Sequence, residues 1–453
     1  MDACTLQELA AMCKGKLLQG DPQCLISCFS QDTRKLHPGD VYIALRGERF
    51  DGNQFLDKAA ACGAAAAIAE NLSHVPINPK FAVVLVPNAL EALQHLAESW
   101  RDKIIPKVVC ITGSNGKTTT KELTATVLAT RYSVASTSGN FNNHIGLPLS
   151  ILATSSAHSA AVWEIGMSHR GDIRRLAQLA RPQIGVITNI GVAHIGNMGS
   201  REAIADEKGT IAHHIAVDGT LILSAEDDFS KKMASSSPRR ALFVGLHYGA
   251  ITASNIEVLA NGSRFVVNGF GKSASVRLSV PGKHIVKDAL FAIAVGLELG
   301  VPISDGAIAL SQASLINCHP QLHIKHSIQF IDDSYNANPD SVVAAISTLS
   351  EMPCQGRRLA VIGRMDELGI FSKAGYHQVA HAVATSPVHT LITVGEETLP
   401  LIEEAKKIGM RHVHHIPNTA TTATFLNKVT LPGDLVLVKG SHSACMGSII
   451  EQF

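Results

Sequence analysis

Short apolar runs alternate with segments of helical periodicity through the middle of the chain. Four runs are almost continuously apolar: VVCIT at 108–112, AAVWEIG at 160–166, IGVITNIG at 184–191 and GTLILS at 219–224. Such runs are typical of strands that are buried on both faces of a parallel sheet. HIVKDALFAIAVGLELG at 284–300 has the spacing of an amphipathic helix and ends on a glycine, a common C-cap. The pattern predicts a large α/β domain, and the alternating run SVRLSVP at 275–281 predicts an added antiparallel strand.

Two flanking segments show the same alternation of strands and helices. Apolar runs before the central unit lie at 41–45, 64–69 and 81–86, and those after it lie at 328–333, 357–363, 389–395 and 434–440. A predicted helix at 89–103 connects the first unit to the second. We therefore predict an α/β protein of three domains: a small α/β domain at 1–86, a P-loop-like parallel-sheet domain at 87–316, and a Rossmann-like domain at 317–453.

Composition narrows the class of partner. The chain has 39 basic and 38 acidic residues, and this balance gives no basic field for nucleic acid or a membrane surface. Nine cysteines are scattered without CxxC pairs, as expected of reduced thiols in the cytosol. The N-terminal segment carries Asp2 and Glu8 and lacks the apolar core of a signal peptide. We therefore expect a cytoplasmic protein with a small-molecule substrate and neither nucleic-acid nor membrane partners.

The stretch HVHH at 412–415 offers a possible metal site. Two of its histidines share one face of a predicted strand, but no carboxylate or cysteine lies close in sequence. The pattern favours an exposed strand over a metal site.

The segment TGSNGKTTT at 112–120 joins a predicted strand to a predicted helix. Backbone amides of such a turn and of the helix N-terminus point at an anion, as in phosphate-binding loops. Lys117 is placed to reach the phosphates, and the hydroxyl of Thr118 suits Mg²⁺. Two residues, not the usual four, separate the glycines, so an ordinary glycine turn is the alternative. The predicted nucleotide contacts are Gly113, Ser114, Asn115, Gly116, Lys117, Thr118 and Thr119.

Three polar residues follow at the ends of successive elements. Glu164 closes a buried apolar run, where a carboxylate needs a metal or an ion-pair partner. His194 lies just beyond the next predicted strand, and Lys208 follows fourteen residues later. Each alone has an ordinary interpretation, and Lys208 by itself is more simply a surface lysine. Together, beside one phosphate loop, they favour a metal–phosphate site.

Several longer motifs carry a resemblance to a known family. They are TGSNGKTTTKE at 112–122, SGNFNNHIGLPLS at 138–150, WEIGMSHRGDI at 163–173, ITNIGVAHIGNMGS at 187–200, EKGTI at 207–211 and IDDSYNANPDS at 331–341. In order and spacing the chain resembles the Mur ligase superfamily, from about residue 4 to its C-terminus. YNANP and the stretch at 30–55 are similar to the branch that adds D-alanyl-D-alanine to UDP-N-acetylmuramoyl-tripeptide.

The resemblance implies an ATP-dependent ligase of peptidoglycan precursor synthesis. ATP would phosphorylate the terminal carboxylate of the tripeptide, and the dipeptide amine would then displace phosphate. By the family pattern Lys117, Glu164, His194 and Lys208 are catalytic. Thr118 and Glu164 would hold one Mg²⁺, and His194 would help to hold a second, with Lys208 converted to a carbamate. A carbamate makes physical sense there because a bare ammonium beside Mg²⁺ would be repelled.

The resemblance also implies binding residues in all three domains and, we expect, a monomer that closes around its substrates. Implied contacts with the UDP-sugar are Thr33, Arg34, Asp51, Gly52 and Asn53. Asn140, Asn142 and Asn143 would line the path of the peptide. The C-terminal domain would bring Asp333, Tyr335, Asn336 and Asn338 to the nucleotide.

Some positions depart from the family pattern, mostly on the adenine side. Ile285 and Asp288 stand where asparagines are expected, and Gln321 stands where an arginine is expected. Arg364, His442, Gly447 and Asn53 are further departures, and we expect altered ATP contacts, with Arg364 or His442 as substitutes. Another Mur-type ligase, a non-catalytic paralogue and a P-loop switch or motor remain as alternatives. Retention of the four implied catalytic residues favours an enzyme.

Overall fold

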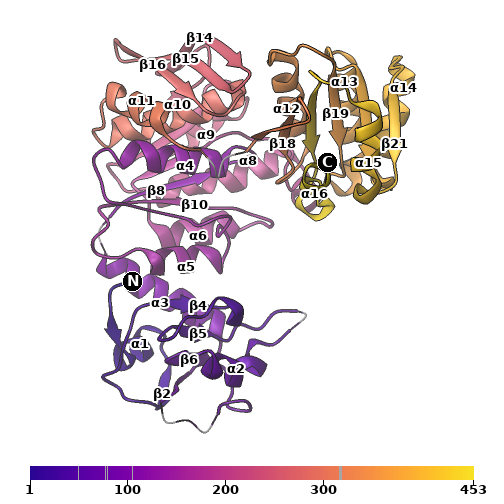
Figure 1. Cartoon of the computed structure of the whole chain (residues 1–453). Coiled ribbons are helices and arrows are strands. Elements are labelled where there is room, and N and C mark those ends of the chain that lie inside the picture. The colour runs from indigo at the N-terminus through magenta and orange to yellow at the C-terminus, as the bar shows by residue number, and fades with distance from the viewer. Residues whose placement is uncertain (49, 77, 79, 105, 316–318) are drawn as a thin grey trace.

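Three α/β units follow one another along the chain in the computed structural model (Figure 1). The structure describes residues 1–48, 50–76, 78, 80–104, 106–315 and 319–453. The three-domain α/β architecture predicted from the apolar pattern is confirmed by three large separate sheets. The predicted bound at 316/317 lies outside the described residues.

The N-terminal unit is built on a five-stranded sheet in the order β2-β7-β6-β5-β4. Its strands β4 to β7 are parallel, and β2 is antiparallel at one edge. A two-stranded pair, β1–β3, lies beside it. The elements are β1 (Cys4–Thr5), α1 (Leu6–Met12), β2 (Lys16–Gln19), β3 (Leu25–Ile26), β4 (Phe29–Ser30), β5 (Val41–Ile43), α2 (Leu56–Ala61), β6 (Ala66–Ala69) and β7 (Ala82–Leu85).

The central unit has a nine-stranded sheet in the order β16-β15-β14-β13-β12-β11-β8-β10-β9. Its parallel strands are β8 (Lys107–Thr112), β9 (Val134–Ser136), β10 (Ala160–Glu164), β11 (Ile184–Ile187), β12 (Thr220–Ser224) and β13 (Arg240–Val244). An antiparallel meander extends the sheet through β14 (Ile251–Leu259), β15 (Gly262–Gly269) and β16 (Lys272–Leu278). The expected antiparallel strand is β16, whereas the sequence analysis missed β14 and β15.

Helices cover both faces of this central sheet. They are α4 (Lys117–Leu128), α5 (Gly146–Ala153), α6 (Asp172–Ala180), α7 (Ile195–Met198), α8 (Arg201–Gly209), α9 (Ser230–Ser236), α10 (Lys283–Glu298) and α11 (Ile303–Gln312). Along β8, Val108 and Cys110 enter one hydrophobic core while Val109 and Ile111 enter another. Alternate side chains of a strand point to opposite faces, so burial of both sets explains the unbroken apolar run.

The C-terminal unit has a six-stranded sheet in the order β17-β18-β22-β19-β20-β21, with β17 antiparallel to the rest. The strands are β17 (Gln321–Lys325), β18 (Ile328–Asp333), β19 (Arg358–Ile362), β20 (Thr390–Val394), β21 (Val413–Ile416) and β22 (Leu435–Lys439). The helices are α12 (Pro339–Glu351), α13 (Ser372–Ala384), α14 (Leu399–Ile408), α15 (Thr419–Val429) and α16 (Gly447–Gln452). The predicted strand with the HVHH stretch is β21, at the sheet edge, and His414 is exposed on it.

Helix α3 (Ala89–Lys103) joins the first two units. Its apolar face packs in the same core as α1 and α5, and the Nε1–H of Trp100 donates to Thr154 O at 2.7 Å. The first two units are therefore packed together through one shared helix. Among the described residues, no helix has the length and apolar character needed to cross a bilayer.

Candidate active site

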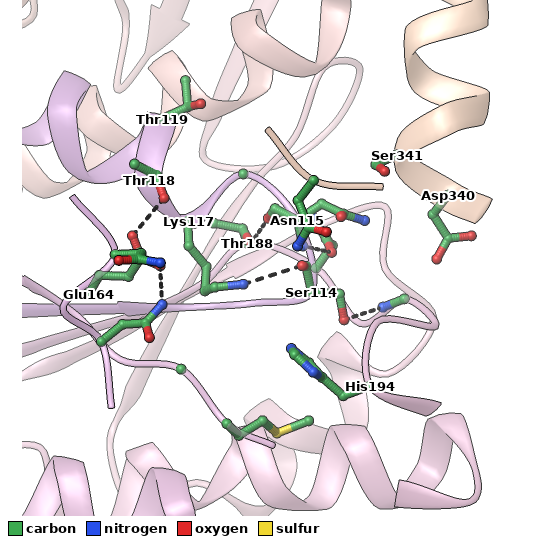
Figure 2. Close-up of a pocket in the computed structure, with 18 of the residues that line it drawn as sticks. Ser114, Asn115, Lys117, Thr118, Thr119, Glu164, Thr188, His194, Asp340 and Ser341 are labelled. Atoms are coloured by element: carbon green, nitrogen blue, oxygen red, sulfur yellow. Dashed lines mark hydrogen bonds between the residues drawn. The ribbon is translucent and has the colours of Figure 1, made fainter. Parts of the chain in front are cut away.

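A cavity of about 1080 Å³ lies between the central and C-terminal units. Its floor is formed where β8, β10 and β11 end, and segments from the C-terminal unit close its opposite side (Figure 2). Polar groups collect there because the carboxyl ends of parallel strands share one sheet edge. The lining includes the predicted residues Ser114 to Thr119, Asn140, Asn142, Asn143, Glu164, His194, Asp333, Tyr335 and Asn336.

The phosphate loop connects β8 to α4 and depends on its glycines. Gly116 has φ +78°, and a Cβ there would lie 2.5 Å from Asp288 Oδ1. The amides of Ser114 and Asn115 donate to the O and Oδ1 of Asn189, each at 3.0 Å, and are therefore not available to a ligand. The amides left free to bind an anion would belong instead to the first turn of α4, where the Thr120 amide is the first to bond back along the helix.

Lys117 lies at the start of α4 and folds against the loop. Its Nζ donates to Gly113 O at 2.9 Å and to Ser114 O at 3.3 Å. Burial lowers the pKa of the Lys117 ammonium, while the carboxylates of Glu164 and Glu367 act in the opposite direction. An incoming phosphate would supply the missing negative charge for this cation.

Thr118 and Glu164 meet at the end of β10 (Figure 2), and Asn142 completes a connected group with them. Thr118 Oγ1 donates to Glu164 Oε2 at 2.8 Å, and Asn142 Nδ2 donates to Glu164 Oε1 at 2.8 Å. Glu164 is only 2% exposed, so both carboxylate oxygens need these partners. The structure thus brings together the two residues expected to hold a metal, and it positions Asn142 beside them.

His194 precedes α7 with a left-handed backbone, φ +64°. Its Nδ1 lies 2.5 Å from Glu367 Oε2 of the C-terminal unit. The hydrogen bond from His194 lowers the pKa of the Glu367 carboxyl. Sequence reasoning did not include Glu367 in the site, although Arg364, three positions earlier, was named as a departure from the family pattern.

Lys208 is not a surface residue, which corrects the simpler interpretation of this lysine taken alone. It is 1% exposed on α8, and its Nζ donates to Gly113 O at 3.0 Å from behind the phosphate loop. It is not part of the cavity lining. Desolvation and the neighbouring Lys117 lower the pKa of Lys208 well below its ordinary value.

The C-terminal unit contacts the phosphate loop directly. Asn338 caps α12 and donates from Nδ2 to Asn115 Oδ1 at 2.7 Å. Two residues on, Asp340 Oδ2 accepts from the Val192 amide at 2.8 Å. Asn189 and Asp340 were missed as site residues, although both lie inside quoted motifs.

Asp333 and Tyr335 line the cavity, and contacts within the C-terminal unit hold their side chains in place. Asp333 Oδ2 accepts from Lys439 Nζ at 2.6 Å, and the Tyr335 ring stacks on His319 with centroids 5.0 Å apart. Lys439 also donates to Asn336 O at 2.9 Å. Lys439 therefore fixes the segment that was expected to meet the nucleotide, and it too was missed.

The two positions expected to replace lost ATP contacts are not part of the cavity lining. Arg364 is held by Glu397 at 3.3 Å and by Asp366 at 3.2 Å. His442 meets the ring of Tyr335 edge-on, with centroids 6.4 Å apart. Asp288 and Ile285, by contrast, both line the cavity.

The five predicted UDP-sugar contacts lie in the N-terminal unit and do not line this cavity. Arg34 pairs with Asp32 at 2.8 Å. Asn53 is 1% exposed: its Nδ2 donates to Asp51 Oδ1 at 2.7 Å, and its Oδ1 accepts from the Glu70 amide at 2.9 Å. These side chains shape the turn, and their contact with a substrate stays a prediction, as it does for Thr33 and Gly52.

Comparison with known proteins covers the whole chain. Family models match residues 26–101 (Mur ligase family, catalytic domain), 111–296 (Mur ligase middle domain) and 321–442 (Mur ligase, glutamate ligase domain). The UDP-N-acetylmuramoyl-tripeptide–D-alanyl-D-alanine ligase of Bacillus subtilis (strain 168) is 34% identical over 99% of this chain and 97% of its own length. The chain belongs to the Mur ligase family. The resemblance inferred from the motifs is confirmed, and a P-loop switch or motor is excluded.

Solved Mur ligase structures extend the likeness to three dimensions. MurF from Acinetobacter baumannii has a TM-score of 0.90 and 31% identity, covering 100% of this chain and 98% of its own. MurF from Thermotoga maritima, solved in complex with ADP, has a TM-score of 0.82 and 28% identity, covering 94% of this chain and 96% of its own. The three-domain fold is therefore shared with other Mur ligases.

Proposed function

We propose that this Mur ligase uses ATP to join D-alanyl-D-alanine to UDP-N-acetylmuramoyl-tripeptide in cytoplasmic peptidoglycan precursor synthesis. The observation that carries the proposal is the cavity in which Lys117, Thr118 and Glu164 meet at the start of α4. The choice of substrates is supported by the full-length similarity to a ligase of that name. The use of ATP is supported by the structural relative in complex with ADP.

The chain's own residues suit the two steps of such a reaction. The phosphates would lie at the N-terminus of α4, where free amides and Lys117 offset their charge. The terminal carboxylate of the tripeptide would attack the γ-phosphate to form an acyl phosphate and ADP. The dipeptide amine would then attack the acyl carbon, and phosphate would leave. Asn140, Asn142 and Asn143 would hold the peptide in line for both steps.

Mg²⁺ fits the donor set at the cavity. Thr118 Oγ1 and Glu164 Oε2 lie 2.8 Å apart, and both are the hard oxygen donors that Mg²⁺ prefers. The described residues contain no cluster of three carboxylate, histidine or cysteine side chains, and Mg²⁺ commonly binds through one or two protein ligands, water and phosphate oxygens. Thr118 and Glu164 would hold one ion, and His194 would help to hold a second. Bound Mg²⁺ would neutralise part of the phosphate charge.

Carbamylation of Lys208 is part of the proposal. A buried amine with a lowered pKa is neutral more often than an exposed lysine, and only a neutral amine can add CO₂. The carbamate would keep one N–H for Gly113 O and would add an anionic group beside Lys117. The modification would place an anionic group, which attracts Mg²⁺, at a position where a protonated lysine would repel it.

Each of the three units would have a different part in binding the substrates. We propose that residues 1–86 bind the UDP-sugar, that 87–316 bind ATP, and that 317–453 close over the nucleotide through Asp333, Tyr335, Asn336 and Asn338. One chain would hold the complete site, as a monomer.

The test of the function is release of ADP when the chain is given ATP, Mg²⁺, a UDP-tripeptide and a candidate amine. D-alanyl-D-alanine should stimulate release at least tenfold over single amino acids. Stimulation by a single amino acid instead would identify another Mur-type ligase. Absence of Mg²⁺-dependent turnover with every amine, at retained ADP binding, would point to a non-catalytic paralogue.

A further inference from the structure

Asp288 places a buried carboxyl group directly against the phosphate loop. The residue lies on α10 and is 5% exposed, and its side chain lines the cavity. A Cβ built on Gly116 would lie 2.5 Å from Asp288 Oδ1 and 3.0 Å from Oδ2. Both carboxyl oxygens therefore stand over the glycine that begins the anion-binding turn. The family pattern would have an asparagine here, which carries no charge.

No ion pair neutralises this carboxyl in the described part of the chain. Lys287, the next residue, pairs with Glu226 at 2.8 Å. From the facing helix α4, Lys117 donates to Gly113 O and Lys121 donates to Thr137 O, so both cations are engaged elsewhere. His284, one turn earlier on α10, lies near Thr348 Oγ1 at 3.5 Å. Burial raises the pKa of Asp288 to about 8, against smaller opposite effects of Thr120 and Lys287.

A nucleotide would make ionisation of this group harder still. Its phosphates bring several negative charges to a loop that Asp288 touches, and like charges in a poorly solvated site repel strongly. The neutral acid avoids this repulsion and offers one O–H donor, much as an asparagine amide would offer N–H.

We propose that Asp288 is a neutral carboxylic acid in the nucleotide complex, and that nucleotide binding is coupled to protonation of this group. The inference rests on the proposed use of ATP at this cavity. By linkage, a ligand that prefers the protonated form takes up a proton where the free group is partly ionised. Affinity should then fall as the pH rises above about 8, by up to about tenfold per pH unit for a single proton.

The experiment is calorimetric binding of ADP with fixed excess MgCl₂ to the full chain at pH 7, 8 and 9. Each pH is measured in two buffers of different ionisation heat, which gives the number of protons taken up. The wild type should take up a fraction of one proton near pH 8 and lose about fivefold in affinity between pH 8 and 9. Asp288→Asn should abolish this part of the uptake and hold its affinity into pH 9. Lys117 and His284 are present in both proteins, so the comparison isolates the part of the uptake that depends on Asp288.

Asp305→Asn is the matched control, since Asp305 is an exposed residue on α11 and does not line the cavity. This variant should show the same proton uptake and the same pH dependence of ADP affinity as the wild type. Equal pH dependence of wild type and Asp288→Asn would overturn the inference. So would loss of ADP binding at pH 7 in a folded Asp288→Asn, which would mean that the ionised carboxylate is required. If the variant does not fold, the wild-type uptake alone decides, and zero uptake at pH 8 rejects the coupling. Absence of wild-type ADP binding at every pH would overturn the proposed function as well.

Discussion

The two walls of the cavity are built in different ways. On the central wall, Thr118, Glu164 and Asn142 are joined to one another by hydrogen bonds within a single unit. On the C-terminal wall, Asn338 and Asp340 reach the site through contacts that cross between units. The first arrangement holds its geometry wherever the C-terminal unit lies, whereas the second exists only when the units meet. We infer that the chemistry is set by the central wall and that the C-terminal wall controls occupancy by nucleotide.

Lys117→Ala should give the largest effect, because it removes the cation from the central wall. The reaction should slow by about 10³-fold at saturating ATP, as expected for loss of a preorganised charge at a transferring phosphoryl group. ADP release with D-alanyl-D-alanine as acceptor measures it. A loss below tenfold would show that the α4 amides alone bind and activate the phosphates.

Lys208→Ala should reduce turnover by about 10²-fold, similar to the loss of other groups that support metal ligands. Because the proposal assigns an anionic carbamate to this position, formate or acetate should restore part of the activity. Full activity without any added carboxylate would reject the carbamate. Rescue by chloride to the same extent would show a charge effect without a carboxylate site.

Asn338→Ala should affect the C-terminal wall alone. KM for ATP should rise by about tenfold, while kcat at saturation should change less than threefold, since a ground-state contact and a helix cap are lost. Asn418→Ala is the matched control, because Asn418 caps α15 in the same manner but its hydrogen bonds stay within that helix, whereas Asn338 also bonds Asn115 of the phosphate loop. If kcat of Asn338→Ala also falls by about tenfold, the two walls do not have the separate roles inferred above.

Lys283→Ala should have the smallest effect. Lys283 and Glu351 form an ion pair across the same two units at 2.9 Å, but the two side chains are 48% and 30% exposed. Pairs of this kind contribute about 0–1 kcal/mol and are screened by salt. KM for ATP should change less than twofold at low salt, and less still at high salt. A larger, salt-dependent change would mean that surface charge also governs how the units meet.

The sequence was most informative where local pattern determines structure. The apolar run at 108–112 predicted a strand buried on both faces, and Val108 and Val109 do enter different cores. Strand β14 was missed because its side chains are mostly half-buried or exposed, so its sequence ITASNIEVL lacks a clear apolar period. A strand of this kind is stabilised by pairing with its neighbours in the meander more than by its own sequence pattern.

The site was predictable only where it follows a motif along the chain. The phosphate loop, Glu164 and Asn142 could be placed from strand ends and from family motifs. Glu367 meets His194 from another unit, and Asp288 meets Gly116 from a helix more than 170 positions away in the sequence. No local period encodes such contacts, so their partners were found only in the folded chain. The burial of Lys208 was missed for the same reason.

Helix α3 sets a limit on how this enzyme can be divided for study. Leu93, Leu96 and Trp100 occupy one continuous core with residues of α1 on one side and of α5 on the other. A shortened chain that starts at β8 would uncover the apolar face of α5, and one that starts at α3 would uncover the side of α3 that packs on α1. Either fragment should aggregate, because each cut exposes an apolar surface that is buried in the full chain. Shortened chains made for crystallisation or for screening should therefore keep the first two units together.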